Sequence, residues 1–83
     1  MRVRYSKSAQ KALLRSDKRN LIREKIGALA FDPVSVSANV VKLQGREECR
    51  LRVQNWRVVY VIGDDGLLVL DIAPRGSVYE VKK

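Results

Sequence analysis

The architecture of this 83-residue chain follows from one segment, Arg50-Leu51-Arg52-Val53-Gln54-Asn55-Trp56-Arg57-Val58-Val59-Tyr60. In it, the polar pair Gln54-Asn55 separates a run of alternating charged and apolar residues, 50–53, from a run rich in β-branched and aromatic residues, 56–60. This pattern is typical of two antiparallel strands joined by a two-residue turn. Because successive side chains of a strand point to opposite faces of a sheet, this turn pairs Arg52 with Arg57 and puts Arg50 on the same face. The segment therefore predicts a hairpin with three arginines on one face and apolar side chains on the other.

Elements on either side of this hairpin complete a small sheet and two helices. Alternation and turn residues predict strands over residues 2–5, 39–43, 49–53, 56–62 and 67–72. Apolar residues at helical spacing predict a helix over 7–15 capped by Ser6, and a second helix, capped by Asp17, that ends before Asp32-Pro33. We expect residues 32–38 to form a loop. The predicted fold is α+β, in the order β-α-α-β-β-β-β, with two N-terminal helices on one face of a mainly antiparallel sheet and the other face open to a ligand.

Charge is the most unusual property of the composition. The chain has 17 Lys and Arg against 9 Asp and Glu, no His, and a net charge of +8. With 46% hydrophobic residues it is apolar enough to fold, and its length predicts one domain, residues 1–83. Such a positive balance favours a polyanionic partner.

The positive charge is concentrated in the amino-terminal third. Residues 1–25 contain nine basic residues and two acidic ones. Lys7, Lys11 and Arg15 follow each other at four-residue spacing and form one ridge of the predicted first helix, with no interleaved glutamate to pair with them. Such a ridge occurs on many exposed helices, but because it lacks acidic partners we interpret it as a surface that docks on a polyanion.

Several mechanisms are excluded by residue types that the chain lacks. With no His and a single cysteine, Cys49, the sequence excludes a Cys/His zinc cluster, an internal disulfide and a His-based catalytic triad. It contains no phosphate-binding glycine loop, metal-ligand carboxylate cluster or Ser nucleophile motif. No apolar run approaches the length of about 20 residues that spans a bilayer, and the amino terminus does not read as a secretory signal. One cysteine fits a reducing, cytoplasmic setting.

The arginine face admits two interpretations. Like charges opposite each other on neighbouring strands cost up to about 1 kcal/mol, and neither strand of the hairpin carries an acid, which favours an anion-binding site. The alternative is a solvated face whose acidic partners come from elsewhere, namely Asp71, Glu47 or Glu48. Trp56 and Tyr60 fall on the opposite face in this register and are assigned to the core.

An ordered set of segments along the whole chain resembles the RelE branch of the RelE/ParE toxin superfamily. Each segment is weak alone, but their order is specific, and an arginine and a tyrosine four residues apart follow the last strand. The segments are Phe31-Asp32-Pro33, Val41-Lys42-Leu43-Gln44-Gly45, Arg50-Leu51-Arg52-Val53, Trp56-Arg57-Val58-Val59-Tyr60 and Arg75-Gly76-Ser77-Val78-Tyr79.

The resemblance implies a small cytoplasmic toxin of a type II toxin–antitoxin system. Toxins of the RelE type are endoribonucleases that enter the ribosomal A site, cut messenger RNA there and are neutralised by a cognate RelB-like antitoxin. The implied chemistry is attack of the substrate's own 2′-hydroxyl on the adjacent phosphate, which leaves a 2′,3′-cyclic phosphate and a 5′-hydroxyl and needs no metal or other cofactor. A site of this kind depends on orientation and dense positive charge.

Carried over by position, the resemblance implies a catalytic set of Arg50, Arg52, Arg57, Arg75 and Tyr79. Arg57 matches the phosphate-stabilising arginine, Arg75 the arginine that stabilises charge or assists the leaving group, and Tyr79 the tyrosine that orients or activates the 2′-hydroxyl. Arg50 and Arg52 replace two lysines of the best-studied type, and because arginine stays protonated we expect them to act electrostatically. Tyr79 is then the leading candidate for proton transfer.

The basic residues outside this set are expected to contact ribosomal RNA. Seven of them lie in the first 25 residues, and the eighth lies in the strand predicted over 39–43. They are Lys7, Lys11, Arg15, Lys18, Arg19, Arg23, Lys25 and Lys42.

Two other functions remain open. One is a ParE-like toxin that poisons DNA gyrase without being a nuclease. The other is a RelE relative that has lost activity and acts as a binding module. ParE-like toxins generally lack the basic and tyrosine set, so its presence here favours the nuclease.

Overall fold

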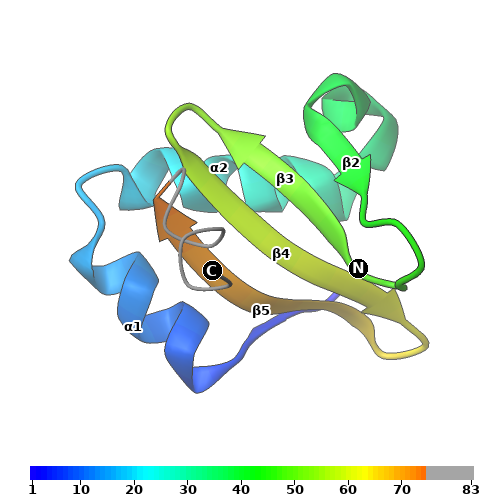
Figure 1. Ribbon diagram of the computed structural model, residues 1–83, viewed down its shortest axis with the longest axis horizontal. Helices are drawn as coiled ribbons and strands as arrows, with labels where there is room; N and C mark the ends of the chain where they lie inside the picture. The colour runs from blue at the N-terminus through cyan, green and yellow to red at the C-terminus, as the bar shows by residue number, and fades with distance from the viewer. Residues whose placement is uncertain (75–83) are drawn as a thin grey trace.

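The computed structural model describes residues 1–74, which form a five-stranded sheet with helices on one face (Figure 1). The elements are β1 (Val3–Tyr5), α1 (Lys7–Arg15), α2 (Arg19–Phe31), the 3-10 helix η1 (Pro33–Asn39), β2 (Val40–Lys42), β3 (Cys49–Val53), β4 (Trp56–Gly63) and β5 (Gly66–Pro74). The strand order is β1-β5-β4-β3-β2. β1 is parallel to β5, and all other neighbours are antiparallel. The predicted α+β fold, a mainly antiparallel sheet with two N-terminal helices, is confirmed.

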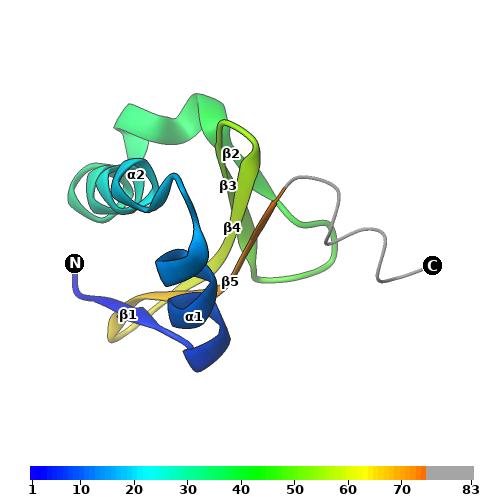
Figure 2. The ribbon, with the colours of Figure 1, turned by 90° about the vertical axis from the view of Figure 1, so that its left-hand side faces the viewer.

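The core lies between the helices and one face of the sheet. Figure 2 shows α1 and α2 on the same side of the strands. α2 contributes Ile22, Ile26 and Leu29, each at most 2% exposed, and these residues lie on one face because they recur at helical spacing. Leu51 and Val58 meet them from the hairpin β3–β4. The other face of the sheet carries neither helix.

The start of α2 differs from the sequence prediction. α2 begins at Arg19, and its N-cap position is Lys18 rather than Asp17. Ser16, which is buried, takes over the local bonding: its Oγ accepts a hydrogen bond from the backbone N–H of Lys18 at 3.0 Å. The predicted cap of α1 is confirmed, since Ser6 accepts from the backbone N–H of Ala9 at 3.0 Å. No helix within residues 1–74 combines the length and the apolar character needed to cross a membrane.

The segment predicted as a loop over 32–38 is largely helical. It forms η1, which begins at Pro33 directly after α2. Ser35 donates twice to the carbonyl oxygen of Asp32, from its backbone N at 3.0 Å and from its Oγ at 2.7 Å. Val36 is buried in the core. A proline at the start, a local hydrogen-bonded turn and one apolar anchor therefore order this connection to the edge of the sheet.

Strand β1 docks beside β5 through a close backbone approach at Gly66. The N–H of Leu67 donates to the carbonyl oxygen of Arg2 at 2.7 Å. Gly66 has φ +122°, and a Cβ at this position would clash with the same Arg2 carbonyl oxygen. Both the backbone conformation and the contact therefore require glycine here.

Candidate functional site

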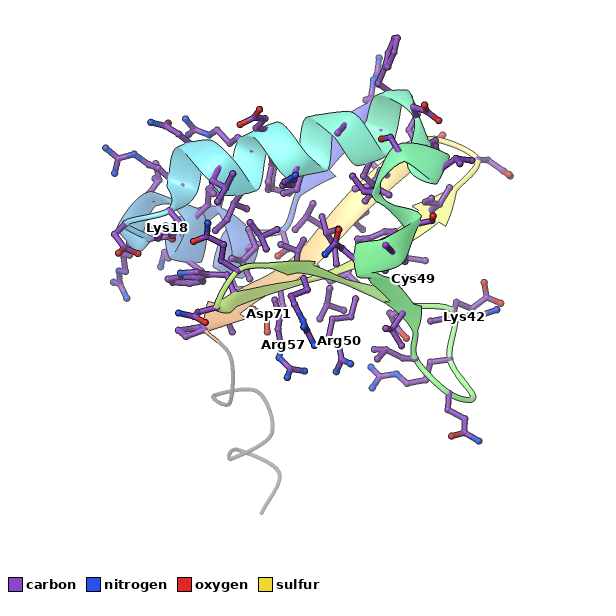
Figure 3. The ribbon with its side chains drawn as sticks, turned by 90° about the horizontal axis from the view of Figure 1, so that it is seen from above. Lys18, Lys42, Cys49, Arg50, Arg57 and Asp71 are labelled. Carbon is purple, nitrogen blue, oxygen red and sulfur yellow. The ribbon has the colours of Figure 1, made fainter. Side chains whose placement is uncertain are left out.

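The hairpin β3–β4 presents the three arginines as its sequence predicts. Arg52 lies opposite Arg57, and Arg50 lies opposite Val59. Figure 3 shows Arg50 and Arg57 projecting from the sheet face that is turned away from the helices. Arg52 is exposed, while Arg50 and Arg57 are half-buried, and the intervening Leu51 is completely buried on the helical side. The predicted register and the shared face of the three arginines are confirmed.

A small pocket adjoins two of these arginines at the edge of the sheet. It measures about 130 Å³ and is lined by Ala38, Asn39, Val41, Arg50 and Arg52. Val41 pairs with Arg50 across β2 and β3, so the pocket opens on the arginine face, where η1 meets the hairpin. Pockets for drug-sized ligands occupy roughly 300–1,000 Å³. This one therefore suits a small anionic group, for which planar guanidinium donors are well matched.

The arginine face also carries an acid, Asp71 of β5. Asp71 lies opposite Val59, the residue that lies opposite Arg50 on its other side. Figure 3 shows the side chains of Asp71, Arg50 and Arg57 on the same side of the sheet. Asp71 is exposed, and its Oδ1 accepts a hydrogen bond from the backbone N–H of Ile72 at 2.9 Å. From the sequence alone, Asp71 is predicted only as a neutralising partner for the arginines.

The three acids that the sequence offers as neutralising partners differ in their ion pairing. Glu48 pairs with Arg46, whose Nε lies 2.9 Å from Glu48 Oε1. The hydrogen bond from Arg46 lowers the pKa of the Glu48 carboxyl. Within residues 1–74, neither Asp71 nor Glu47 forms an ion pair. Of the candidate acids, Asp71 lies on the arginine face (Figure 3), and Glu48 is bound by Arg46 instead.

The described tyrosines belong to the helical side of the sheet. Tyr60 is 2% exposed, and burial, with the neighbouring Cys49 thiol adding to it, raises the pKa of Tyr60 to about 12. Tyr5 packs against the same core, and burial raises its pKa as well. Neither phenol faces the arginines. Arg75 and Tyr79 lie outside the described residues, and their roles remain predictions.

The basic residues expected to bind RNA do not lie on the same face of the sheet as Arg50, Arg52 and Arg57. All eight are exposed. Those of α1 and α2 lie on the far side of the sheet, and Figure 3 shows Lys18 on the helical side, away from Arg50 and Arg57. In β2, Lys42 pairs with Cys49 and thus belongs to the face opposite Arg50. The structure therefore separates two basic surfaces: the arginine face, and the helical surface formed by Lys7, Lys11, Arg15, Lys18, Arg19, Arg23 and Lys25.

Among residues 1–74, the groups available for chemistry on the arginine face are guanidinium and carboxylate. Within residues 1–74, no three His, Cys, Asp or Glu side chains are grouped as a metal site would require. Guanidinium groups bind phosphate oxygens and stabilise negative charge. A carboxylate accepts hydrogen bonds and protons. This combination is suited to binding a phosphodiester and moving one proton beside it.

Solved structures of RelE toxins share this architecture. The archaeal RelE–RelB complex from Pyrococcus horikoshii OT3 contains a chain 28% identical to this one, with a TM-score of 0.74 over 92% of this chain and 96% of that chain. The isolated Escherichia coli RelE toxin is 21% identical, with a TM-score of 0.70 over 96% and 92% of the two chains. The RelB–RelE complex from Methanococcus jannaschii is 21% identical, with a TM-score of 0.67 over 95% and 98%. No curated protein sequence matches the chain.

The fold is thus that of a RelE/ParE superfamily toxin, as the sequence resemblance predicts. Residues 3–79 match the family described as the ParE toxin of type II toxin–antitoxin system, parDE. The match covers nearly the whole chain, and the chain belongs to this family.

Proposed function

We propose that this toxin is a cytoplasmic, ribosome-dependent endoribonuclease that cuts messenger RNA in the A site and is neutralised by a RelB-like antitoxin. One observation carries the proposal: Arg50, Arg52 and Arg57 lie together on the sheet face that the helices leave uncovered. RelE–RelB complexes among the structural neighbours support the antitoxin partner.

The arginine face supplies the electrostatic part of the proposed reaction. As the 2′-oxygen adds to phosphorus, negative charge develops on the phosphate oxygens, and fixed guanidinium donors stabilise it. Arg52 and Arg57 approach one phosphate from two adjacent strands, and the pocket beside Arg50 receives a neighbouring phosphate. Arg75 and Tyr79 complete the proposed set, at the leaving group and the 2′-hydroxyl respectively.

The helical surface supplies docking in this proposal. Its lysines and arginines are exposed, and they lie across the sheet from the arginine face (Figure 3). Ribosomal RNA bound there leaves the arginine face free to receive messenger RNA. Such binding rests on many phosphate contacts and is therefore sensitive to salt.

A second candidate function is inhibition of DNA gyrase, which the match to the ParE toxin family favours. A binding module without catalytic activity is the third. The arginine face favours the nuclease over both, because three guanidinium groups on one sheet face are suited to binding the phosphate groups of RNA.

Mapping of nucleic-acid ends after induction tests the proposal. The wild type and an Arg4→Ala control, which removes an exposed arginine of β1, are expected to produce new 5′-hydroxyl ends within codons on translating ribosomes. Arg57→Ala is expected to abolish these ends, and Tyr79→Phe to reduce them. DNA breaks without new RNA ends would establish the gyrase function instead, and the absence of both would establish a binding module.

A further inference from the structure

An irregularity in β5 brings Asp71 onto the arginine face. β4 and β5 pair continuously except between Val59 and Tyr60, where the register shifts. Tyr60 lies opposite Val69, and Val59 lies opposite Asp71, so Leu70 has no residue opposite it. Leu70 is therefore the extra residue of a β-bulge.

The bulge determines the direction in which Asp71 points. In a regular strand, residues two apart share a face, and Asp71 would join the buried Leu67 and Val69 beneath the helices. With Leu70 inserted, Ile72 takes the core position, at 2% exposed, and Asp71 faces solvent. Bulges are enriched next to active sites, where they redirect a side chain. The bulge in β5 does this for the one acid within the five described strands.

Ser6 fixes the bulge from the helical side. Its backbone N–H donates to the carbonyl oxygen of Val69 at 2.9 Å, and its Oγ donates to the carbonyl oxygen of Leu70 at 2.7 Å. The same Oγ accepts from the N–H of Ala9 as the N-cap of α1. Because the two carbonyls before Asp71 are bonded to the start of a helix, the placement of Asp71 is built into the fold.

Asp71 is a near neighbour of two of the arginines in the sheet. Arg50, Val59 and Asp71 form one row across three strands, and Arg57 lies in the next row, diagonal to Asp71. Diagonal neighbours in antiparallel sheets are about 7–8 Å apart and within reach of long side chains, so Arg57 and Asp71 can contact the same bound phosphodiester. The hydrogen bond from Ile72 to Oδ1 orients the carboxylate.

We propose that Asp71 is the general base of the cleavage reaction, an inference that rests on the proposed nuclease function. It leaves Tyr79 the role of orienting the 2′-hydroxyl and not that of accepting its proton. Arginine does not give up its proton at physiological pH. Tyr5 and Tyr60 pack into the core on the helical side. Among residues 1–74, Asp71 is therefore the group on this face that accepts a proton from a substrate hydroxyl.

In the proposed step, the 2′-hydroxyl gives its proton to a carboxylate oxygen of Asp71 as the 2′-oxygen forms a bond to phosphorus. The bond between phosphorus and the 5′-oxygen of the next nucleotide breaks. That oxygen leaves with the electron pair and takes a proton from water, and Asp71 returns its own proton to the hydroxide that remains. The products are a 2′,3′-cyclic phosphate and a 5′-hydroxyl, and the arginines stabilise the charge on the phosphate between the two bonds.

Single-turnover cleavage on purified, messenger-programmed ribosomes tests the role of Asp71. Asp71→Asn keeps the shape of an exposed side chain and is expected to fold, which thermal unfolding checks. We expect it to cleave at least about 100-fold more slowly than the wild type, with unchanged ribosome affinity. Asp71→Glu is expected to recover part of the rate. Asp64→Asn, which alters an exposed acid of the β4–β5 turn, is the matched control and is expected to cleave like the wild type.

The other possible results distinguish failure of the general-base role from failure of the nuclease function. Wild-type cleavage by Asp71→Asn, or weaker ribosome binding with an unchanged rate, overturns the general-base role and leaves the nuclease function standing. Intact messenger RNA with the wild-type toxin overturns the nuclease function itself. A substrate with sulfur as the 5′-bridging atom has a leaving group that needs no proton. The Asp71→Asn defect is expected to persist on it, and a restored rate would overturn the assignment by moving Asp71 to the leaving group.

Discussion

Arg52 and Arg57 lie directly opposite each other across the β3–β4 hairpin, on the sheet face that the helices leave uncovered. Like charges in this relationship repel each other, at a cost of a few tenths to about 1 kcal/mol. A bound phosphate removes that repulsion by placing negative charge between the two guanidinium groups. A polyanion that binds both side chains therefore offsets a repulsion that the pairing of the two strands brings with it.

Replacing one member of this pair is expected to increase stability and to decrease activity. Arg52→Gln should raise the free energy of unfolding by about 0.2–1 kcal/mol, because it removes the like-charge pair, and should slow messenger RNA cleavage. Urea denaturation of the purified protein measures the first effect. Lys42→Gln is the control, since Lys42 is an exposed strand cation that lies opposite Cys49 and not opposite a charge. A destabilised Arg52→Gln would contradict the expectation.

The two glycines of the β4–β5 turn should respond differently to alanine. Gly66→Ala is expected to lower the free energy of unfolding by more than about 1 kcal/mol, because φ is positive and the new Cβ clashes with Arg2. Gly63→Ala meets no atom within 4 Å and should change stability much less. Chemical denaturation of both variants checks the difference. Equal losses would show that the contact with β1 contributes little.

Stability is expected to fall at alkaline pH because of Tyr60. Burial raises the pKa of Tyr60 to about 12, from an ordinary value of 10.0, because folding favours the protonated phenol. This contribution is fully present below pH 10 and is lost as the pH rises through about 12. Urea unfolding at a series of pH values measures the decline. The free energy of unfolding of Tyr60→Phe should depend less on pH over that range than that of the wild type. A parallel decline in both proteins would rule out Tyr60 as its source.

The helical surface is expected to control ribosome affinity and not the chemical step. A triple variant, Lys7→Gln/Lys11→Gln/Arg15→Gln, should bind ribosomes more weakly and reduce the slope of log affinity against log salt by about 2–3, if each side chain contacts one phosphate. Cleavage at saturating ribosome concentration should remain at the wild-type rate. Arg46→Gln, in the loop between β2 and β3, serves as the control. An unchanged salt slope would assign docking to another surface.

The hairpin could be predicted from sequence because its pairing is local. A two-residue turn fixes every partner of β3 and β4, and the helical spacing of Ile22, Ile26 and Leu29 similarly fixes the buried face of α2. The position of Asp71 could not be predicted in this way. The run from 67 to 70 is apolar at every position, so alternation does not reveal the bulge, and the bulge is held by Ser6, 64 residues before Leu70.

The predictions that were wrong at the ends of α2, its cap and the loop over 32–38, failed for a similar reason. The sequence offers Asp17 as a cap for α2, but the neighbouring Ser16 is buried and bonds the turn instead. η1 forms because Val36 finds a place in the core, and no local signal indicates that place. The arginines of the hairpin were found because a sheet face follows from alternation, whereas the roles of Arg75 and Tyr79 remain predictions from family resemblance.

Because β1 and β5 are neighbours in the sheet, the order of synthesis constrains how this toxin folds. β1 and both helices are synthesised early, but their neighbour in the sheet, β5, is the last strand described. Contacts so distant in sequence form late in folding. The nascent chain therefore lacks the strand that pairs with β1 until β5 emerges, and Asp71 does not join the arginines of the β3–β4 hairpin before then. If the toxin acts on translating ribosomes as proposed, its site is incomplete while it is still being synthesised, and a partner has that interval in which to bind the unfinished chain.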